Sequence, residues 1–208
     1  HADVGHVSAE TKAFYYKINR DLAIETAKKA KVDRVRQFIF MSSMIIYGES
    51  AGVGKTKVIT RETKPHPANF YGDSKWQADK GVRNLEDEYF HVAVVRPPMI
   101  YGKGSKGNYP VLAKLAKKLP VFPDIKNVRS MLHIENLCEF LTLLMEDGES
   151  GIYFPQNKEY VRTSQMVKMI GKVSGHQIRI TKILNSVVWI AGRIPGKISR
   201  VVNKAFGN

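Results

Sequence analysis

Tyr71 and Lys75 stand four residues apart in the stretch "NFYGDSKWQADK" and have the clearest chemical potential in the chain. On a helix, side chains at this spacing share one face, with Cβ atoms roughly 5–6 Å apart. A nearby ammonium stabilises a phenolate, and bringing the pKa of a tyrosine from ~10 to ~7 takes about 4 kcal/mol. Such a phenol could take a proton from an alcohol. The spacing also occurs by chance in many helices, so the surrounding sequence must show whether the pair has a chemical role.

Segments typical of helices and strands alternate around this pair. Apolar positions recur at helical spacing in residues 15–31, and residues 36–43 form a short apolar run rich in β-formers. Residues 69–89 again have helical spacing, and residues 91–98 form a second strand that prolines end. This order predicts an α/β fold with a Rossmann-like, doubly wound parallel sheet, in which ligands bind beyond the carboxyl ends of the strands.

Both predicted strands end in chemically useful residues. Ser42 and Ser43 end the first strand, and Arg96 stands before Pro97 and Pro98 at the end of the second. These residues therefore fall where an open α/β sheet binds its ligands.

The second half of the chain has shorter predicted elements and more glycines and prolines. From Tyr101 onward, glycines and prolines interrupt short elements, followed by a predicted helix at 134–146, a strand "GIYFP" and a helix near 163–174. We interpret this part as a smaller α+β region on the substrate side. The predicted boundaries are 1–105 for the cofactor-binding part, to which 129–148 returns, and 106–128 with 149–208 for the substrate-binding part.

Charge and composition limit the partners. There are 33 Lys and Arg against 19 Asp and Glu, and the resulting charge of +14 favours anions such as nucleic acids, membrane surfaces or phosphorylated metabolites. The basic residues are scattered without interleaved aromatics, so nucleic-acid binding is a minor hypothesis. No apolar run approaches the ~20 residues that span a bilayer, and a cytoplasmic location is the default expectation. The single cysteine, Cys138, excludes an internal disulfide and is predicted to be a small buried side chain.

An ordered set of motifs covers residues 15–137. The stretches "YYKIN", "FIFMSSMIIYGE", "NFYGDSK", "VVRPPMIYGKG" and "RSMLHIENL" follow one another in the sequence. In order and spacing they resemble the extended short-chain dehydrogenase/reductase family, and within it the NAD-dependent nucleotide-sugar epimerases related to UDP-glucose 4-epimerase. The resemblance turns the pair at 71 and 75 into a catalytic hypothesis.

The resemblance implies a role for each matching position of the catalytic site. Tyr71 would be the acid/base, Lys75 would hold the nicotinamide ribose and lower the tyrosine pKa, and Ser43 would bridge substrate and tyrosine. Ser42 would line the cofactor side. Two further cofactor-side positions are Asn19, which would support the site from a neighbouring helix, and Pro98, which would lie near the nicotinamide amide.

Three more positions resemble those that bind the nucleotide diphosphate. They are Asn108, Phe122 near the base, and Arg129, whose guanidinium would bind phosphate oxygens. Structural alternatives remain open for several positions. Ser42 and Ser43 could instead be capping or turn serines, Phe122 a core aromatic, and Arg129 a surface charge.

The family's glycine-rich turn, G-x-x-G-x-x-G, does not occur in residues 1–35. In the family this turn lets the backbone approach the cofactor pyrophosphate at a helix N-terminus. We therefore expect this sequence to be an internal piece of a larger enzyme, with the first strands of the sheet missing.

The resemblance implies an NAD-dependent epimerase that inverts C4 of a UDP-hexose through a 4-keto intermediate. A 4-reductase of the same family remains open. A dehydratase is less favoured, because 4,6-dehydratases place Thr-Asp-Glu where this chain has Ser43-Met44-Ile45. A non-catalytic cofactor-sensing protein of the same fold is the alternative from another class. A homodimer is compatible with all of these readings.

Overall fold

The computed structural model describes residues 8–104 and 108–207. The chain divides into two compact units, each of which is assembled from separate stretches of sequence. The first unit comprises His1–Gly48, Arg61–Ile100 and Leu132–Gln156, and the second comprises Glu49–Thr60, Tyr101–Met131 and Asn157–Asn208.

The first unit is built on a parallel sheet of three strands in the order β1-β2-β6. Its strands are β1 (Gln37–Met41), β2 (His91–Val95) and β6 (Gly151–Tyr153). β1 and β2 pair in register from Gln37 opposite His91 to Met41 opposite Val95, so both strands end at the same edge. The predicted parallel α/β sheet is confirmed.

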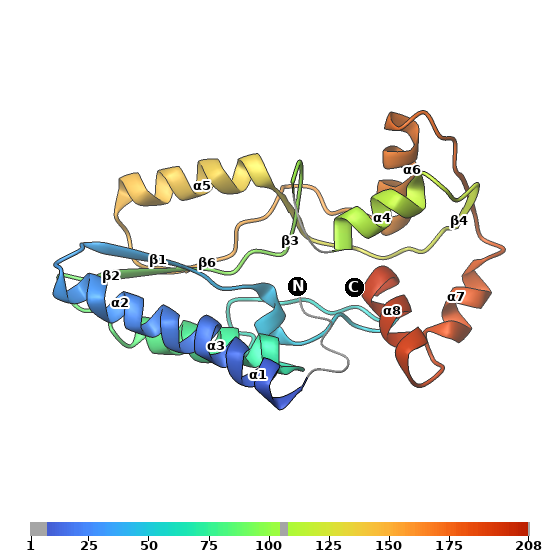
Figure 1. Ribbon diagram of the computed structural model, residues 1–208. Helices are drawn as coiled ribbons and strands as arrows, with labels where there is room; N and C mark the ends of the chain where they lie inside the picture. Colours follow the sequence, from blue (N-terminus) through green and yellow to red (C-terminus); the bar gives the residue numbers. More distant parts are fainter. Residues whose placement is uncertain (1–7, 105–107, 208) are drawn as a thin grey trace. The chain divides into compact units, whose positions relative to one another are not determined.

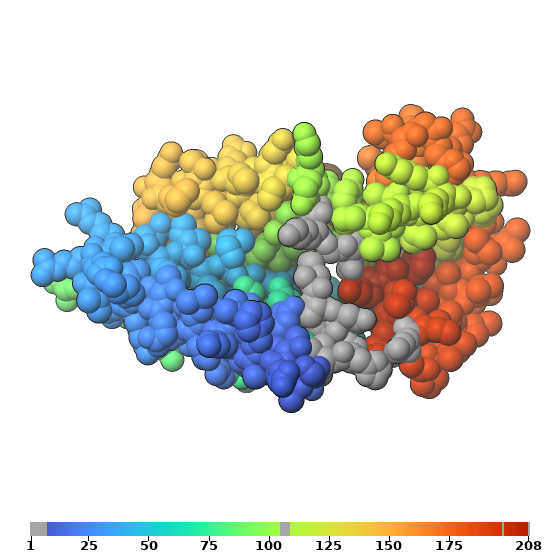
Figure 2. Space-filling view, in the orientation of Figure 1, coloured from blue at the N-terminus to red at the C-terminus, as the bar shows by residue number. Residues whose placement is uncertain are grey.

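Helices cover both faces of this sheet, as Figure 1 shows: α5 (Ile134–Asp147) lies on one face, and α2 (Ala23–Val32) and α3 (Phe70–Arg83) lie on the other. In the space-filling view, the yellow atoms of α5 and the blue atoms of α1 (Ala9–Tyr16) and α2 are exposed on the face turned to the viewer (Figure 2). β2 is therefore buried on both faces, which explains its nearly continuous apolar sequence.

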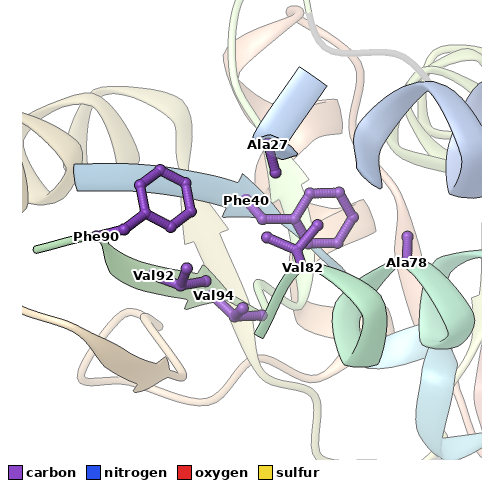
Figure 3. Close-up of a cluster of buried hydrophobic side chains, with 7 residues drawn as sticks. All are labelled: Ala27, Phe40, Ala78, Val82, Phe90, Val92 and Val94. Carbon is purple, nitrogen blue, oxygen red and sulfur yellow. The ribbon is translucent and has the colours of Figure 1, made fainter. Parts of the chain in front are cut away.

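Alternate residues of β2 enter two separate cores. One core packs against α2 and α3, and Figure 3 shows its seven buried side chains: Ala27, Phe40, Ala78, Val82, Phe90, Val92 and Val94. The other core lies under α5 and contains Ala93, Val95, Leu132, Leu137 and Leu144.

The prediction that Cys138 is buried was wrong, because the cysteine is exposed on α5. Leu137 and Leu144, seven residues apart, form the buried line of this helix. Cys138 is displaced from that line by one residue, about 100° around the helix axis.

The helix predicted over 15–31 is longer than expected and is interrupted. α1 runs directly into a π-helical segment, Lys17–Leu22, which continues into α2. Such one-turn π segments occur mostly within α-helices and frequently at functional sites. The segment carries Asn19, one of the predicted site residues.

The helix predicted over 69–89 is shorter than expected. Asn69 caps the start of α3, its side-chain oxygen accepting from the Gly72 N–H at 2.9 Å, and the helix ends at Arg83. Asp87 and Phe90 then form an antiparallel bridge that turns the chain into β2. This turn uses the residues that the periodicity had assigned to the helix.

The second unit contains a two-stranded parallel sheet of β4 (Val121–Pro123) and β7 (Arg179–Thr181). Asn127, in the loop after β4, is bonded to the start of α6: its side chain donates to the Thr163 hydroxyl at 2.9 Å and accepts from the Thr163 N–H at 3.0 Å. The helices of this unit are α4 (Asn108–Ala116), α6 (Thr163–Val173), α7 (Asn185–Ala191) and α8 (Lys197–Phe206). The short strands β3 (Met99–Tyr101) and β5 (Met131–His133) lie where the chain passes from one unit to the other.

The two largest differences between the units and the predicted parts concern residues 149–156 and residues 49–60. Residues 149–156 belong to the first unit, because β6 joins the parallel sheet beside β2 after the α5 crossover. Residues 49–60 belong to the second unit, where the Val53 N–H donates to the Asn203 side chain at 3.1 Å.

A buried ion pair fixes α3 on the sheet. Arg96, which follows β2, donates from Nε and Nη2 to the two carboxylate oxygens of Asp79 on α3, at 2.9 and 2.8 Å. Its third nitrogen donates to the Tyr47 hydroxyl at 2.7 Å, and Arg83 adds a bond to Asp79 at 3.0 Å. The Asp79 side chain is fully buried and that of Arg96 is 5% exposed.

We expect Asp79→Ala to lower the free energy of unfolding by about 3–5 kcal/mol, because it leaves the Arg96 charge buried without its carboxylate. Equilibrium urea denaturation measures this loss. Glu25→Ala is the matched control, since it removes the exposed pair between Glu25 and Lys28 and should cost less than about 1 kcal/mol. Equal losses in the two variants would show that the buried pair does not hold the helix.

Candidate active site at the strand ends

The ends of β1 and β2 are fastened to each other. The Ser42 N–H donates to the carbonyl of Val95 at 2.8 Å, and the Met44 N–H donates to the carbonyl of Pro97 at 3.1 Å. Ser43 lies between these bonds and caps the 3₁₀ helix Met44–Tyr47, its Oγ accepting from the Ile45 N–H at 3.3 Å. The capping role left open by the sequence is therefore present, and the Ser43 hydroxyl keeps its own proton to donate.

The first turn of α3 lies directly against this loop. A Cβ placed on Gly72 would come within 3.0 Å of the Ile45 carbonyl oxygen and 3.4 Å of Pro67 Cβ. Glycine is needed here for close approach rather than for an unusual backbone angle. Because Tyr71 precedes Gly72 and Ser43 lies two residues before Ile45, this contact joins the two predicted catalytic segments.

Lys75 lies one helical turn further along α3 and reaches back to the end of β1. Its Nζ donates to the Met41 carbonyl at 3.1 Å and lies 5.3 Å from the centroid of the Phe40 ring. Burial lowers the pKa of Lys75. The ammonium is thus held at the carboxyl edge of the sheet, one residue before Ser42.

The Tyr71 ring is half-buried and packs edge-on against Tyr15 of α1, with centroids 6.2 Å apart. Burial, and after it the charge that Tyr15 can carry, raise the pKa of Tyr71. Within residues 8–104 and 108–207, the Tyr71 hydroxyl makes no hydrogen bond. The phenol therefore holds its proton at neutral pH unless a cation is brought close to it.

Asn19 supports the same helical turn from the π segment. Its Nδ2 donates to the Ser74 hydroxyl at 3.1 Å, and that hydroxyl donates to the Tyr71 backbone carbonyl at 2.9 Å. The supporting role expected of Asn19 thus runs through Ser74, a fully buried residue that the sequence analysis missed. Its signal was position: Ser74 lies three residues after Tyr71, where a hydroxyl can bond back into the helix.

The three nucleotide-side predictions fall in the second unit. Phe122 is buried in β4 and packs against Phe206 of α8, with ring centroids 5.5 Å apart. Arg129 is half-buried and donates to the carbonyls of Gly207, at 3.1 and 3.0 Å, and of Lys204, at 2.5 Å. Burial lowers the pKa of Arg129. Asn108 begins α4, and its side chain lies outside the described part of the molecule.

Comparison with known proteins decides the family. Residues 2–154 match the model of the NAD dependent epimerase/dehydratase family. The chain belongs to this family. Its members are NAD-dependent enzymes, so the resemblance seen in the motifs is confirmed at the level of the family and its cofactor.

Two curated relatives of this epimerase/dehydratase chain are epimerases. UDP-glucose 4-epimerase of Vibrio cholerae is 30% identical over 166 residues, which cover 77% of this chain and 50% of the relative. N-acetyl-alpha-D-glucosaminyl-diphospho-ditrans,octacis-undecaprenol 4-epimerase of Escherichia coli O157:H7 is 25% identical over 202 residues, 93% of this chain and 59% of the relative. The chain therefore spans about half the length of the curated relatives it matches.

Solved structures agree on the fold. A UDP-glucose 4-epimerase structure superimposes with a TM-score of 0.67 at 24% identity, over 87% of this chain and 61% of that one. A dTDP-4-dehydrorhamnose reductase and a dTDP-glucose 4,6-dehydratase share the fold as well. The fold therefore does not choose among epimerase, reductase and dehydratase.

The residues at the strand ends fit the family's cofactor. Ser42 is buried, and within the described ranges its Oγ has no hydrogen-bond partner. A buried hydroxyl without a partner is costly, and a polar ligand that bonds to it would remove the cost. Lys75 bonds to the residue before Ser42, and Pro98 is half-buried beyond the end of the neighbouring strand.

We expect Ser42→Ala to raise the free energy of unfolding by about 1 kcal/mol when no NAD is added, because it removes a buried hydroxyl that lacks a partner. Urea denaturation measures the change. Ser74→Ala is the matched control: it removes a buried hydroxyl that makes two hydrogen bonds and should cost about 1–3 kcal/mol. A comparable loss in Ser42→Ala would mean that its hydroxyl already has a partner.

Proposed function

We propose that the protein is an NAD-dependent nucleotide-sugar epimerase that inverts C4 of a UDP-hexose. The observation that carries the proposal is the arrangement at the strand ends: Lys75 is anchored at the end of β1, and the turn with Tyr71 packs on the Ser43 loop. The 30% identity with a UDP-glucose 4-epimerase supports the choice of reaction.

The chain's residues divide the proton chemistry among them. Tyr71 takes the proton of the sugar C4 hydroxyl while C4 is oxidised to a ketone. It returns the proton to the oxygen when the ketone is reduced on its other face. Ser43 donates its free proton to the substrate oxygen and keeps that oxygen close to the phenol. NAD, when bound, accepts the hydride and gives it back.

Lys75 has a positioning and an electrostatic part in this proposal. The Met41 carbonyl fixes its ammonium at the sheet edge, where the ammonium can donate to ribose hydroxyls with its remaining protons. Its charge would oppose the effect of burial on the pKa of Tyr71 only if the ammonium came closer to the phenol, because burial and Tyr15 together raise that pKa in the structure. The same arrangement could serve a 4-reductase, which remains an alternative within the family.

Dehydration is less well supported. The resemblance places Ser43, Met44 and Ile45 where 4,6-dehydratases have Thr-Asp-Glu, and neither Met44 nor Ile45 carries a group that can act as acid or base. A cofactor-sensing protein without catalysis would have no need of the Tyr71 and Lys75 side chains in this setting.

A second candidate substrate is a sugar joined through diphosphate to a polyprenol. The E. coli relative, whose name contains such a substrate, matches over 93% of this chain, including most of the second unit. Both candidate substrates present a diphospho-sugar, so the residues at the strand ends would perform the same chemistry on either.

Arg129 is proposed to bind a phosphate of the substrate, although its guanidinium already bonds to carbonyls at the end of α8. Arg129→Lys keeps the charge but loses the planar set of donors. We expect at least a tenfold weaker affinity for UDP-sugars, roughly the value of one charged hydrogen bond, measured by calorimetry in the whole protein. If Arg129→Lys lowered the free energy of unfolding but left the affinity for UDP-sugars unchanged, Arg129 would only cap α8 and would not bind the substrate.

We expect Tyr71→Phe to reduce turnover of the whole protein by a factor of at least ~100, because proton transfer is needed in both half-reactions. The ring can still pack on Tyr15, so the circular dichroism spectrum should not change. Ser43→Ala is the control and should retain more activity, since a water could relay the proton. Near-normal turnover of a folded Tyr71→Phe variant would exclude Tyr71 as the acid/base.

A further inference from the structure

The last part of the chain has an unusual charge distribution. Residues 160–208 contain no Asp or Glu, whereas the rest of the chain carries all 19 acidic residues. This stretch supplies a large share of the net charge of +14. Its basic residues are Arg162, Lys168, Lys172, Arg179, Lys182, Arg193, Lys197, Arg200 and Lys204.

The helices α7 and α8 of this stretch, and the turn with Ile194 between them, also expose large apolar side chains. These side chains are between 47% and 67% exposed: Val187, Trp189, Ile190, Ile194, Ile198 and Val201. We call these six residues the apolar face. On α8, the basic residues Arg200 and Lys204 are exposed beside it. In Figure 2 the orange-red atoms of α7 and the red atoms of α8 reach the molecular surface.

Other residues of the two helices anchor them to the second unit. Phe206 packs on Phe122 in β4, and Asn203 donates to the Gly192 carbonyl at 3.1 Å while accepting from the Val53 N–H. The C-terminal carbonyls of α8 bond to Arg129. The apolar face is therefore exposed even though both helices are packed against the second unit through other residues.

Trp189 and Arg193 form a contact suited to a boundary between apolar and charged surroundings. The Arg193 guanidinium lies 3.1 Å from the centroid of the Trp189 ring, and its Nη1 donates to the Trp189 carbonyl at 3.2 Å. Tryptophan is enriched at the level of lipid headgroups, because its apolar ring can face the acyl chains while its polar N–H faces water.

We propose that the apolar face of α7 and α8 docks on an anionic lipid bilayer, with the aliphatic side chains entering the boundary of the acyl region. Amphipathic helices bind membranes in this way when an apolar face is combined with basic residues. Each basic residue near an anionic surface adds about 1 kcal/mol, or roughly a factor of five in binding. No helix in the described ranges is long and apolar enough to cross a membrane, so the proposal concerns attachment to one surface.

Two other occupants fit these observations less well. A second copy of the chain would bring two copies of the same basic surface together, because a two-fold interface uses the same patch on both subunits. Like charges brought together in this way oppose association. Nucleic acid would use the positive charge but not the isoleucines and valines, since single strands bind by stacking on aromatic rings.

Vesicle co-sedimentation of the whole protein tests the proposal. We expect binding to vesicles of phosphatidylcholine with phosphatidylglycerol, at least tenfold weaker binding to phosphatidylcholine alone, and weakening with added salt. Ile198→Ser combined with Val201→Ser should weaken binding at least tenfold, and Arg200→Gln combined with Lys204→Gln should do the same. Circular dichroism verifies that each variant is folded.

The matched control replaces exposed apolar residues elsewhere: Leu143→Ser with Met145→Ser on α5, which are 53% and 60% exposed. This variant should bind vesicles like the unmodified protein. Equal effects of the α5 and α8 variants, or no binding to anionic vesicles, would overturn the proposal. The proposal would also be overturned if the unmodified protein bound no vesicles and its molar mass by light scattering differed from that of the Ile198/Val201 variant. The apolar face would then join copies of the chain.

Discussion

The placement of α3 depends on the ion pair between Asp79 and Arg96. Charges this deeply buried lose their hydration, and only good geometry offsets that loss. The structure supplies the geometry through a fork of two N–H groups on one carboxylate, with Tyr47 and Arg83 completing the bonds. An apolar contact would allow α3 to slide or rotate, whereas a two-pronged bond defines its position. We interpret the ion pair as the device that sets the register of α3 on the sheet.

The register of α3 matters because Tyr71 and Lys75 lie on this helix, about two turns and one turn before Asp79 respectively. Lys75 reaches Met41 only if α3 lies at the right height, and Tyr71 reaches the Ser43 loop only if Gly72 permits close approach. The hydrogen bonds from Asn19 to Ser74 and from Ser74 to the Tyr71 carbonyl also hold this turn of the helix. Three contacts from β2, β1 and the π segment therefore position one pair of side chains.

The parallel sheet, and the gathering of Ser43, Tyr71 and Lys75 near its carboxyl edge, could be predicted from the sequence because their signals are local. A run such as "HVAVV" has few alternatives to a strand buried on both faces, and Tyr71 and Lys75 share a helix by spacing alone. The roles of Phe122 and Arg129 in packing and capping α8 could not be predicted, since their partners lie more than seventy residues away. The bond from Asn19 to Ser74 could not be predicted either, because these residues lie 55 apart in the sequence. Cys138 was misplaced because a difference of one position decides which face of a helix a residue joins.

Burial shifts the pKa values of Tyr71 and Lys75 in opposite directions, and this limits the proton chemistry that the proposed catalytic pair can perform. It raises the pKa of Tyr71 from its ordinary value of 10.0 and lowers that of Lys75 from 10.5. Both shifts favour the neutral form, because a desolvated site penalises a phenolate and an ammonium alike. The cations of the described residues do not offset this for Tyr71. A positive charge that binds beside the phenol would lower its pKa and let it take a proton. In the proposed epimerisation, loss of that charge once the substrate is oxidised would restore the high pKa of Tyr71, and the phenol could then keep the proton until the keto sugar is reduced.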